Sequence, residues 1–534
     1  MIENPILKGF NPDPDIIRVG DTYYIVTSTF EWFPGYQIHK SKDLRNWQLV
    51  SRPLNRTSQL DMKGVPDSGG VWAPCISYNP INELFYLPYT NVRRFDGAGI
   101  DCPNYVVTAK DIEGEWSEPT YVKSAGFDGS FFHDDDGKSY FLNMIVDHRC
   151  ADFFGGIQLQ EYDCDHKALI GKAQKIFGNT GLGCTEGPHL YKRNGYYYLL
   201  LAEGGTGYDH CITLARSKSI SGPYEVHPDN PVITAKYKPD NYLQRTGHGG
   251  LVETPDGQWY LTFLTGRPLT EHGRCIMGRE SGIEKVEWRT DDWLYPVSGD
   301  KAPRRFVEAP DLPDYIFEQE PAFIDFNTAN ISKCFQSLRV PMTPDWVNQT
   351  ERVGFMRIYG RESLCSKFEQ SLVARRIQAK HTITETCVEF NPISYQQMAG
   401  LTCYYNTYTY HYLYLSGSNT GKRKYLNIIT GLRHQVEEPL LEAIEVTGFD
   451  KIWLKADFNG AELQFYFAIE ENQWQAIGPV LDGSILSDEF VEGTPGPFRP
   501  CFTGAFVGMA CQDLSGRNLP ADFEYFSYQE VEGN

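Results

Sequence analysis

The sequence predicts an all-β fold in two parts, a five-bladed β-propeller followed by a β-sandwich. Three observations predict this fold. A short aromatic strand recurs five times in the first half of the 534-residue chain. Aromatic residues, which favour β structure, make up 14% of the whole chain. No segment between these strands carries the period of a long amphipathic helix. Beyond residue 322 the recurring unit gives way to longer strands of alternating polarity.

The five aromatic strands are spaced like repeats of one structural unit. They read DTYYIVTS, ELFYLPYT, KSYFLNMI, GYYYLLLA and GQWYLTFL, and their equivalent positions are Tyr24, Tyr86, Tyr140, Tyr198 and Tyr260. Each strand follows a turn-like Gly, Asp or Asn, which is typical of a tight hairpin. Repeats of about four strands each, arranged radially, form a propeller.

One further position recurs eleven or twelve residues before each of these tyrosines. It holds Asp13, Cys75, Asp128, Glu186 and His248. The first strand of each blade lines the central channel of a propeller, so we expect these side chains to converge. Taken singly, an aspartate before a proline indicates a turn, and a lone histidine indicates the core. Three acids at one shared position instead indicate an acid–base site, because stability alone disfavours such convergence.

Other carboxylates carry no such signal. Asp15 and the hairpin-tip residues Asp134, Asp135 and Asp136 are interpreted as turn residues.

Composition excludes several classes of partner. The net charge is −20 with no basic stretch, which argues against nucleic acid and favours a small neutral ligand. No run approaches the roughly 20 apolar residues of a membrane span. The N-terminal MIENPILKGFNPDP lacks the features of a signal peptide. The thirteen cysteines show no zinc-type spacing, so we expect free thiols, no metal centre and a cytoplasmic location.

Several motifs together resemble those of glycoside hydrolase family 43. They are FNPDPDI, GGVWAPCISY, GFDGSFFHDDDG, CTEGPHLY and CIMGRE, and the resemblance extends to STFEWFPG at 28–35 and TGAFVG at 503–508. It is greatest to the bacterial β-xylosidases of the family that carry a C-terminal β-sandwich. The resemblance implies an exo-acting hydrolase that releases xylose from the nonreducing end of β-1,4-xylo-oligosaccharides, with side activity on α-L-arabinofuranosides.

The resemblance also implies the catalytic roles. Asp13 would be the general base that activates water, Glu186 the general acid, and Asp128 the carboxylate that orients the acid and raises its pKa. The family mechanism is inverting, which requires one ionised and one protonated carboxyl about 6.5–9.5 Å apart. Inversion rests on the resemblance, because the sequence does not contain that distance.

Matching positions imply a pocket for a single sugar. Arg279 would bind substrate and catalytic carboxylates, although a salt bridge that only holds the channel together is the alternative. In the sandwich, Phe506 would close the pocket, the alternative being a core aromatic. The remaining substrate contacts would be the ring walls Phe30, Trp72 and Phe127 with Thr206 and His248. No cofactor is required; calcium near His248 is optional, because one histidine is a poor site for an ion that prefers about 6–8 oxygens.

Two departures from the family pattern concern the channel. Cys75 replaces an aspartate that many members carry, and is interpreted as a channel-lining spacer. The segment between GRP and the GRE of Arg279 is short, which leaves the leaving-group preference open.

Three alternative functions remain: a primary α-L-arabinofuranosidase, a non-catalytic sugar-binding protein with the sandwich as lectin, and an interaction scaffold. The three intact acids argue against a binding protein.

The predicted boundaries follow the change of pattern. Residues 1–307 form the propeller, the Pro- and acid-rich 308–321 a linker, and 322–534 the lectin-like β-sandwich. The resemblance also implies a homo-oligomer, a dimer or tetramer.

Overall fold

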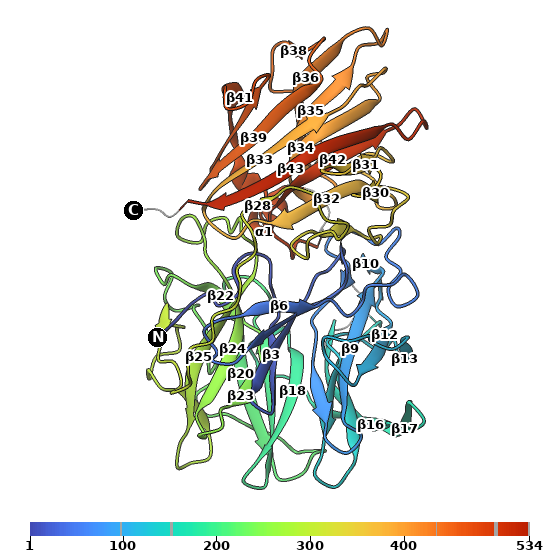
Figure 1. Ribbon diagram of the computed structural model, residues 1–534. Helices are drawn as coiled ribbons and strands as arrows, with labels where there is room; N and C mark the ends of the chain where they lie inside the picture. The colour runs from blue at the N-terminus through green and yellow to red at the C-terminus, as the bar shows by residue number, and fades with distance from the viewer. Residues whose placement is uncertain (97–98, 150–152, 434, 496–499, 532–534) are drawn as a thin grey trace. The chain divides into compact units, whose positions relative to one another are not determined.

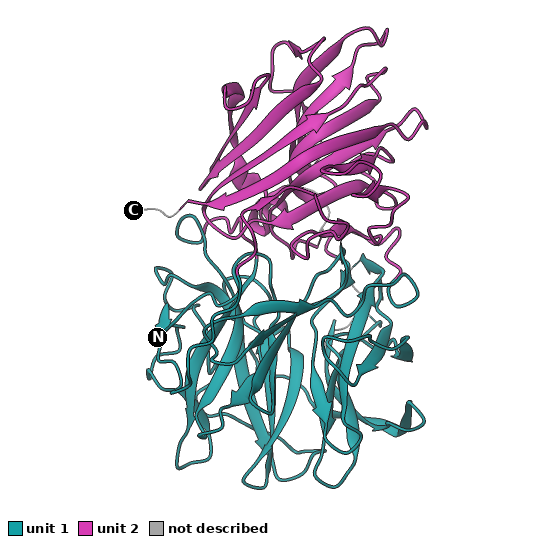
Figure 2. Ribbon diagram, viewed as in Figure 1, with its two compact units in different colours: residues 1–60, 69–272, 279–318 teal, residues 61–68, 273–278, 319–534 magenta. Residues whose placement is uncertain are grey.

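The computed structural model describes residues 1–96, 99–149, 153–433, 435–495 and 500–531. The chain forms two compact units, shown in different colours in Figure 2. The first contains residues 1–60, 69–272 and 279–318, and the second contains 61–68, 273–278 and 319–534. Residues 308–318 of the expected linker thus group with the first unit. Two short segments from within the expected propeller range group with the second.

The first unit is a five-bladed β-propeller made of antiparallel sheets (Figure 1). The first blade contains β2 (Asp15–Val19), β3 (Thr22–Thr27), β5 (Gln37–Ser41) and β6 (Gln48–Ser51). The second contains β7 (Gly70–Val71), β8 (Ser77–Asn79), β9 (Leu84–Val92), β12 (Asn104–Ala109) and β13 (Thr120–Lys123). The third contains β14 (Ser130–His133), β15 (Ser139–Val146), β16 (Phe154–Asp163) and β17 (Ala168–Phe177).

The last two blades have the same plan. The fourth contains β18 (Glu186–Arg193), β19 (Tyr196–Glu203), β20 (Cys211–Ser217) and β21 (Glu225–Val226). The fifth contains β22 (Gln244–Gly247), β23 (Leu251–Glu253), β24 (Trp259–Gly266), β25 (Glu280–Trp288) and β26 (Leu294–Pro296). Outside the blades lie β4 (Trp32–Phe33) and the pair β10 (Arg94–Asp96) and β11 (Gly99–Asp101).

The repeat predicted from the aromatic strands is confirmed strand by strand. The five marker tyrosines lie in β3, β9, β15, β19 and β24. The first strand of the second and fifth blades is split into two pieces, and when these count as one strand, each tyrosine lies on the second strand of its blade. Tyr24 pairs with Ile17 and Tyr260 with Val252, both on inner strands. Each inner strand is therefore held by the aromatic strand that follows it.

The N-terminal segment closes the ring onto the fifth blade. β1 (Ile2–Glu3) pairs with β27 (Phe306–Val307), and the Asn11 amide donates to the Arg279 carbonyl at 2.9 Å. Buried side chains of adjacent blades share hydrophobic clusters, and Leu214 of the fourth blade and Phe263 of the fifth belong to one of them. This closure places Asp13, just after Asn11, beside residues almost 270 positions away.

The second unit is a β-sandwich. One sheet contains β28 (Phe323–Ile324), β30 (Val347–Asn348), β31 (Met356–Tyr359), β33 (His381–Glu389), β39 (Lys451–Asn459), β40 (Glu462–Ala468), β41 (Gln475–Asp482) and β43 (Pro520–Glu530). The other contains β32 (Ser371–Arg376), β34 (Gln397–Asn406), β35 (Thr409–Gly417), β36 (Lys424–Leu432), β37 (Gln435–Glu437), β38 (Ile444–Glu445) and β42 (Phe506–Asp513). The unit also contains β29 (Ser337–Leu338), the 3₁₀ turn η1 (Gly483–Ile485) and the helix α1 (Asp488–Gly493).

The two inserted segments have specific partners within this second unit. Arg339 donates to the carbonyl of Val65 and to Asp67, each at 2.8 Å. Ala505 donates to the carbonyl of Ile276 at 2.9 Å. A search of the described residues for a helix with the length and apolarity to cross a membrane finds none.

Candidate active site

Asp13 lies two residues before β2 in a left-handed backbone conformation, with φ of 55°. Its carboxylate is buried and has two polar partners. Ser28 Oγ donates to Oδ2 at 2.6 Å, and Arg279 Nη1 donates to Oδ1 at 3.2 Å. A hydroxyl and a guanidinium that point at one carboxylate stabilise its negative charge. This is the form that a general base needs.

Asp128 occupies the equivalent position of the third blade, with φ of 54°. Its Oδ2 accepts a hydrogen bond from the Gly187 amide at 2.9 Å. Burial, followed by the negative charge of Asp13, raises the pKa of Asp128 from 3.8 to about 8. Asp128 therefore holds a proton at pH values where most carboxyls have lost theirs.

Glu186 is the first residue of β18, and the pairing with β19 shifts register between Glu186 and His189. Burial raises the pKa of Glu186 well above its ordinary value, and the charges of Asp128 and Asp13 raise it further. Arg279 opposes this shift. A glutamic acid whose pKa is raised in this way has the property required of a general acid.

Gly187, which follows the proposed acid Glu186, contacts both Asp128 and His248. Its amide binds Asp128, and its φ is +58°. A Cβ at this position would lie 2.9 Å from the His248 ring, so only glycine allows the histidine to approach. The three predicted acids are thus brought into one channel, where each acts electrostatically on another.

Arg279 joins the acids to an aromatic wall. Its side chain is 2% exposed, and its guanidinium lies 5.1 Å from the centre of the Phe30 ring. Phe30 and Trp72 have ring centroids 6.3 Å apart, and Trp72 and Phe127 have theirs 5.0 Å apart. The three aromatic residues predicted as pocket walls form one continuous row beside the acids.

His248 lies behind Asp13, with Nδ1 4.0 Å from Asp13 Oδ1. Burial lowers its pKa to about 4, so the ring is neutral at physiological pH. A calcium ion here would have one imidazole nitrogen and a carboxylate already bound by Ser28 and Arg279. That donor set does not fit an ion that prefers about 6–8 oxygen ligands, and no step below passes through calcium.

Two predicted pocket residues, Thr206 and Phe506, lie outside the row of aromatic residues and the three acids. Thr206 is half-buried in the loop between β19 and β20, where its carbonyl accepts a hydrogen bond from Arg245 Nε at 3.0 Å. Phe506 begins β42 in the second unit, where it is buried and 5.5 Å from the Arg376 guanidinium. Their contact with a sugar stays a prediction.

The interpretation of Asp15 as a turn residue is wrong. Asp15 is the first residue of β2, is 3% exposed and accepts the Ile76 amide at 2.7 Å. Its side chain lines a cavity in the propeller together with Cys75 and His189. Cys75 lines the same cavity, as expected of a lining residue. Asp134 and its neighbours do lie in the turn between β14 and β15.

Sequence reasoning missed three polar residues around the acids. Ser28 binds Asp13, although a serine between strands gives no signal on its own. His210 is buried beside His248 and Arg279, and burial, followed by its interactions with these two residues, lowers its pKa. Tyr36 is buried beside Asp128 and Asp13, and burial with their charges raises its pKa. Both are found only once the blades are assembled.

Comparison with known proteins gives two consecutive matches. The model of a family described as glycosyl hydrolases family 43 matches residues 2–294. A second, described as the beta xylosidase C-terminal Concanavalin A-like domain, matches residues 324–529.

Whole-length relatives agree with these matches. The chain is 49% identical to "Xylosidase/arabinosidase 43B" of Humicola insolens, over 99% of this chain and 98% of that protein. It is 47% identical to a "Beta-xylosidase" of Bacillus subtilis, over 99% of each. The crystal structure of a xylan beta-1,4-xylosidase from Bacillus halodurans superimposes with a TM-score of 0.96 at 49% identity, covering 99% of this chain and 100% of that one.

Proposed function

The chain belongs to glycosyl hydrolase family 43, and from this premise we propose that it is an inverting, exo-acting β-xylosidase with side activity on α-L-arabinofuranosides. The observation that carries the proposal is the convergence of Asp13, Asp128 and Glu186 in one channel. Two of these acids have a raised pKa, and the third is bound by Arg279 and Ser28. The relatives named as β-xylosidases and xylosidase/arabinosidases support the choice of substrate.

The proposed mechanism divides the work among the three carboxyls. Glu186 gives its proton to the glycosidic oxygen as the bond to the anomeric carbon breaks. Asp13 takes a proton from a water that attacks that carbon from the opposite face. Asp128 holds the backbone beside Glu186 through the Gly187 amide, and once it is ionised its negative charge raises the pKa of Glu186 further. The proton lost from Glu186 returns from solvent.

The pocket wall supports a single pyranose or furanose ring. The faces of Phe30, Trp72 and Phe127 offer an apolar surface of the kind that covers the C–H face of a sugar. Arg279, always charged, can donate to a sugar hydroxyl as well as to Asp13. The second candidate is a primary α-L-arabinofuranosidase, because the name of the Humicola relative includes arabinosidase as well as xylosidase.

The experiment uses aryl β-D-xylopyranoside and aryl α-L-arabinofuranoside with the wild type and Glu186→Ala. We expect faster cleavage of the xyloside, and a large loss of that activity in the variant. Faster cleavage of the arabinoside would make the second candidate the main activity. If the wild type cleaves neither substrate, the result contradicts the hydrolase proposal and favours the sugar-binding alternative. Xylotetraose tests exo action, which predicts xylose and xylotriose as the first products.

We propose further that hydrolysis requires no calcium, which the donor set around His248 supports. The rate after treatment with EGTA should match the untreated rate, and recovery caused by added calcium would contradict the proposal.

We also propose a cytoplasmic location, which the free thiols of the described cysteines support. Self-association as a dimer or tetramer is proposed on the family resemblance. Cell fractionation and light scattering test these two proposals.

A further inference from the structure

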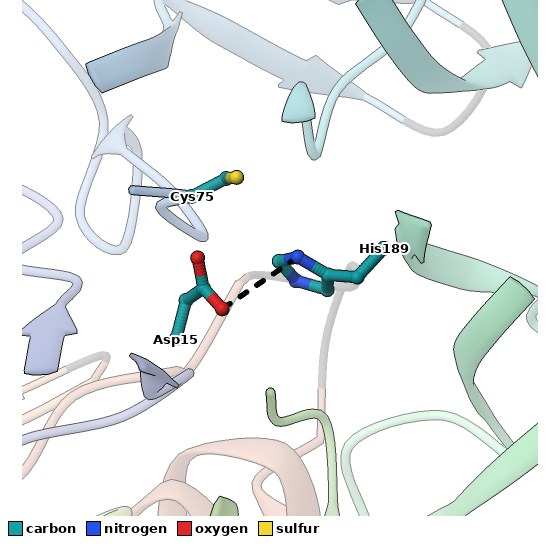
Figure 3. A group of neighbouring side chains, drawn as sticks. All are labelled: Asp15, Cys75 and His189. Carbon is teal, nitrogen blue, oxygen red and sulfur yellow. Dashed lines mark ion pairs between the residues drawn. The ribbon is translucent and has the colours of Figure 1, made fainter. Parts of the chain in front are cut away.

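A second cluster of reactive side chains lies in the propeller channel, separate from the three acids. Figure 3 shows Asp15 from β2, Cys75 from the segment between β7 and β8, and His189 from β18 pointing toward one another. Each offers one ligand atom, and these atoms all lie within 4.8 Å of one another. All three residues are buried. Residues from the first, second and fourth blades thus meet at one point.

The carboxylate of this cluster is fixed in place by backbone amides. Ile76 donates to Asp15 Oδ2 at 2.7 Å, and Ile16 donates to Oδ1 at 2.9 Å. Hydrogen bonds of this kind orient metal ligands and are characteristic of their surroundings. Since Ile76 follows Cys75 directly, the same contact ties the thiol-bearing segment to the carboxylate.

His189 lacks a hydrogen-bond partner that would explain its burial. Its side chain is 7% exposed, and its Nδ1 lies 3.7 Å from Asp15 Oδ1, which is too far for a hydrogen bond. Among the described residues, no hydrogen bond from either ring nitrogen replaces it. A buried imidazole held at this distance from a carboxylate and near a thiol leaves room for an atom between them.

A cavity of about 330 Å³ opens beside the cluster. Its lining includes all three residues together with Ser77, His133 and Tyr191. This volume exceeds the need of one ion and a water molecule. The cavity therefore provides both a path of entry and a position for a water ligand.

A nucleophilic role for Cys75 is not supported by the same geometry. His189 Nδ1 faces the carboxylate, while burial and the charge of Asp15 raise the pKa of the thiol well above its ordinary value. Cysteine nucleophiles need the opposite surroundings, because the thiolate is the reactive form.

We propose that Asp15, Cys75 and His189 bind a zinc ion, with a water molecule from the adjoining cavity as fourth ligand. Sulfur, imidazole nitrogen and carboxylate oxygen are the donors that Zn²⁺ prefers, and three protein ligands plus water complete its tetrahedron. On binding, Cys75 gives its proton to solvent and the sulfur bonds to the metal. The two anionic ligands then balance the charge of the ion, so the buried site is neutral.

The ion would join three blades through residues that lie far apart in the sequence. We therefore assign it a structural role: it stabilises the closed ring, because a ligand that binds only the folded state raises its stability. Hydrolysis itself is carried out by Asp13, Asp128 and Glu186, which do not bind the zinc.

The test uses the full chain, stripped with a chelator and dialysed against ZnSO₄. The proposal predicts one bound zinc per chain by elemental analysis and a higher thermal midpoint. It also predicts loss of the zinc in Cys75→Ala and His189→Gln. Cys164→Ala is the matched control, because Cys164 lies in the same unit outside the cluster and should keep its zinc.

Cobalt provides a second readout, which is taken first on the wild-type protein. Co²⁺ in the wild-type site should show an intense thiolate-to-cobalt charge-transfer band in the near ultraviolet, which requires a sulfur ligand. Absence of stoichiometric zinc binding, or a charge-transfer band that persists in a folded, active Cys75→Ala protein, would overturn the proposal.

Discussion

The Gly187 amide donates a hydrogen bond to Asp128 at 2.9 Å, and this contact joins the third carboxylate to the residue that follows the proposed acid. Asp128 thereby acts on Glu186 in two ways, through the position of its backbone and through charge. Because both effects pass through one short segment, substitutions at Asp128, Glu186 and Gly187 should give distinguishable results.

The Asp128→Asn variant should become more stable than the wild type as the pH rises. The pKa of Asp128 is raised from 3.8 to about 8 in the folded state, so the stability that its proton contributes is complete below about pH 4 and is lost as the pH rises through about 8. Asparagine does not ionise and keeps this stability. Thermal midpoints should be similar at about pH 4 and higher in the variant by about 2 °C or more near pH 8.5. A gap that is constant with pH would contradict this assignment.

The same variant should lose activity, with the alkaline limb of its pH–rate profile moved to lower pH. At the alkaline pH values where Asp128 is ionised, its charge raises the pKa of Glu186, so removal of that charge allows Glu186 to lose its proton at lower pH. A profile that falls in height without moving would show that Asp128 acts by position alone.

Glu186→Gln should affect poor leaving groups most. Loss of general acid catalysis costs about 10²–10⁴-fold in rate, and a good leaving group needs less protonation. We expect a large fall in kcat on xylobiose and a smaller fall on a dinitrophenyl xyloside. Glu115→Gln, whose side chain is 84% exposed, is the matched control and should behave like the wild type. Equal losses on both substrates would count against Glu186 as the acid.

Gly187→Ala should reduce activity through the His248 ring. The new Cβ would lie 2.9 Å from that ring, at a φ of +58°. Gly171→Ala is the matched control, because Gly171 has φ of +67° and nothing within 4 Å. Gly171→Ala should lose about 1 kcal/mol of folding stability from backbone strain, and Gly187→Ala should lose more because the His248 ring must also shift. Only Gly187→Ala should lose kcat, and equal activity of the two variants would contradict the contact.

Arg279→Lys should lower kcat/KM by about 10- to 100-fold, the value of one hydrogen bond to a charged group. Arg304→Lys is the control, since Arg304 pairs with the buried Glu284 of the same blade without reaching the acids. A purely structural role for Arg279 predicts that both variants lose stability and neither loses activity.

Much of the propeller and of its acids could be predicted from sequence, because both follow the repeat. Tyr24 and its four equivalents mark one strand in every blade. Asp13, Asp128 and His248 share one repeat position and one left-handed backbone conformation, with φ of 55°, 54° and 41°. Equivalent positions around an axis converge whatever the details of packing.

Contacts between non-equivalent positions could not be predicted in this way. Asp15, Cys75 and His189 meet although they occupy different positions in their repeats, because the register shift after Glu186 changes which residues of β18 face the channel. Ligand spacing along the chain gives no signal for a cluster assembled from three blades. Similarly, Ser28 reaches Asp13 through the hairpin of the first blade, a contact that composition and periodicity do not contain.

The most direct test of the account follows the anomers of xylose during hydrolysis of a β-xyloside by proton NMR. Water activated by Asp13 attacks from the face opposite the leaving group protonated by Glu186, so α-xylose should appear first and then mutarotate to the equilibrium mixture. Initial release of β-xylose would contradict the division of roles between these two carboxyls.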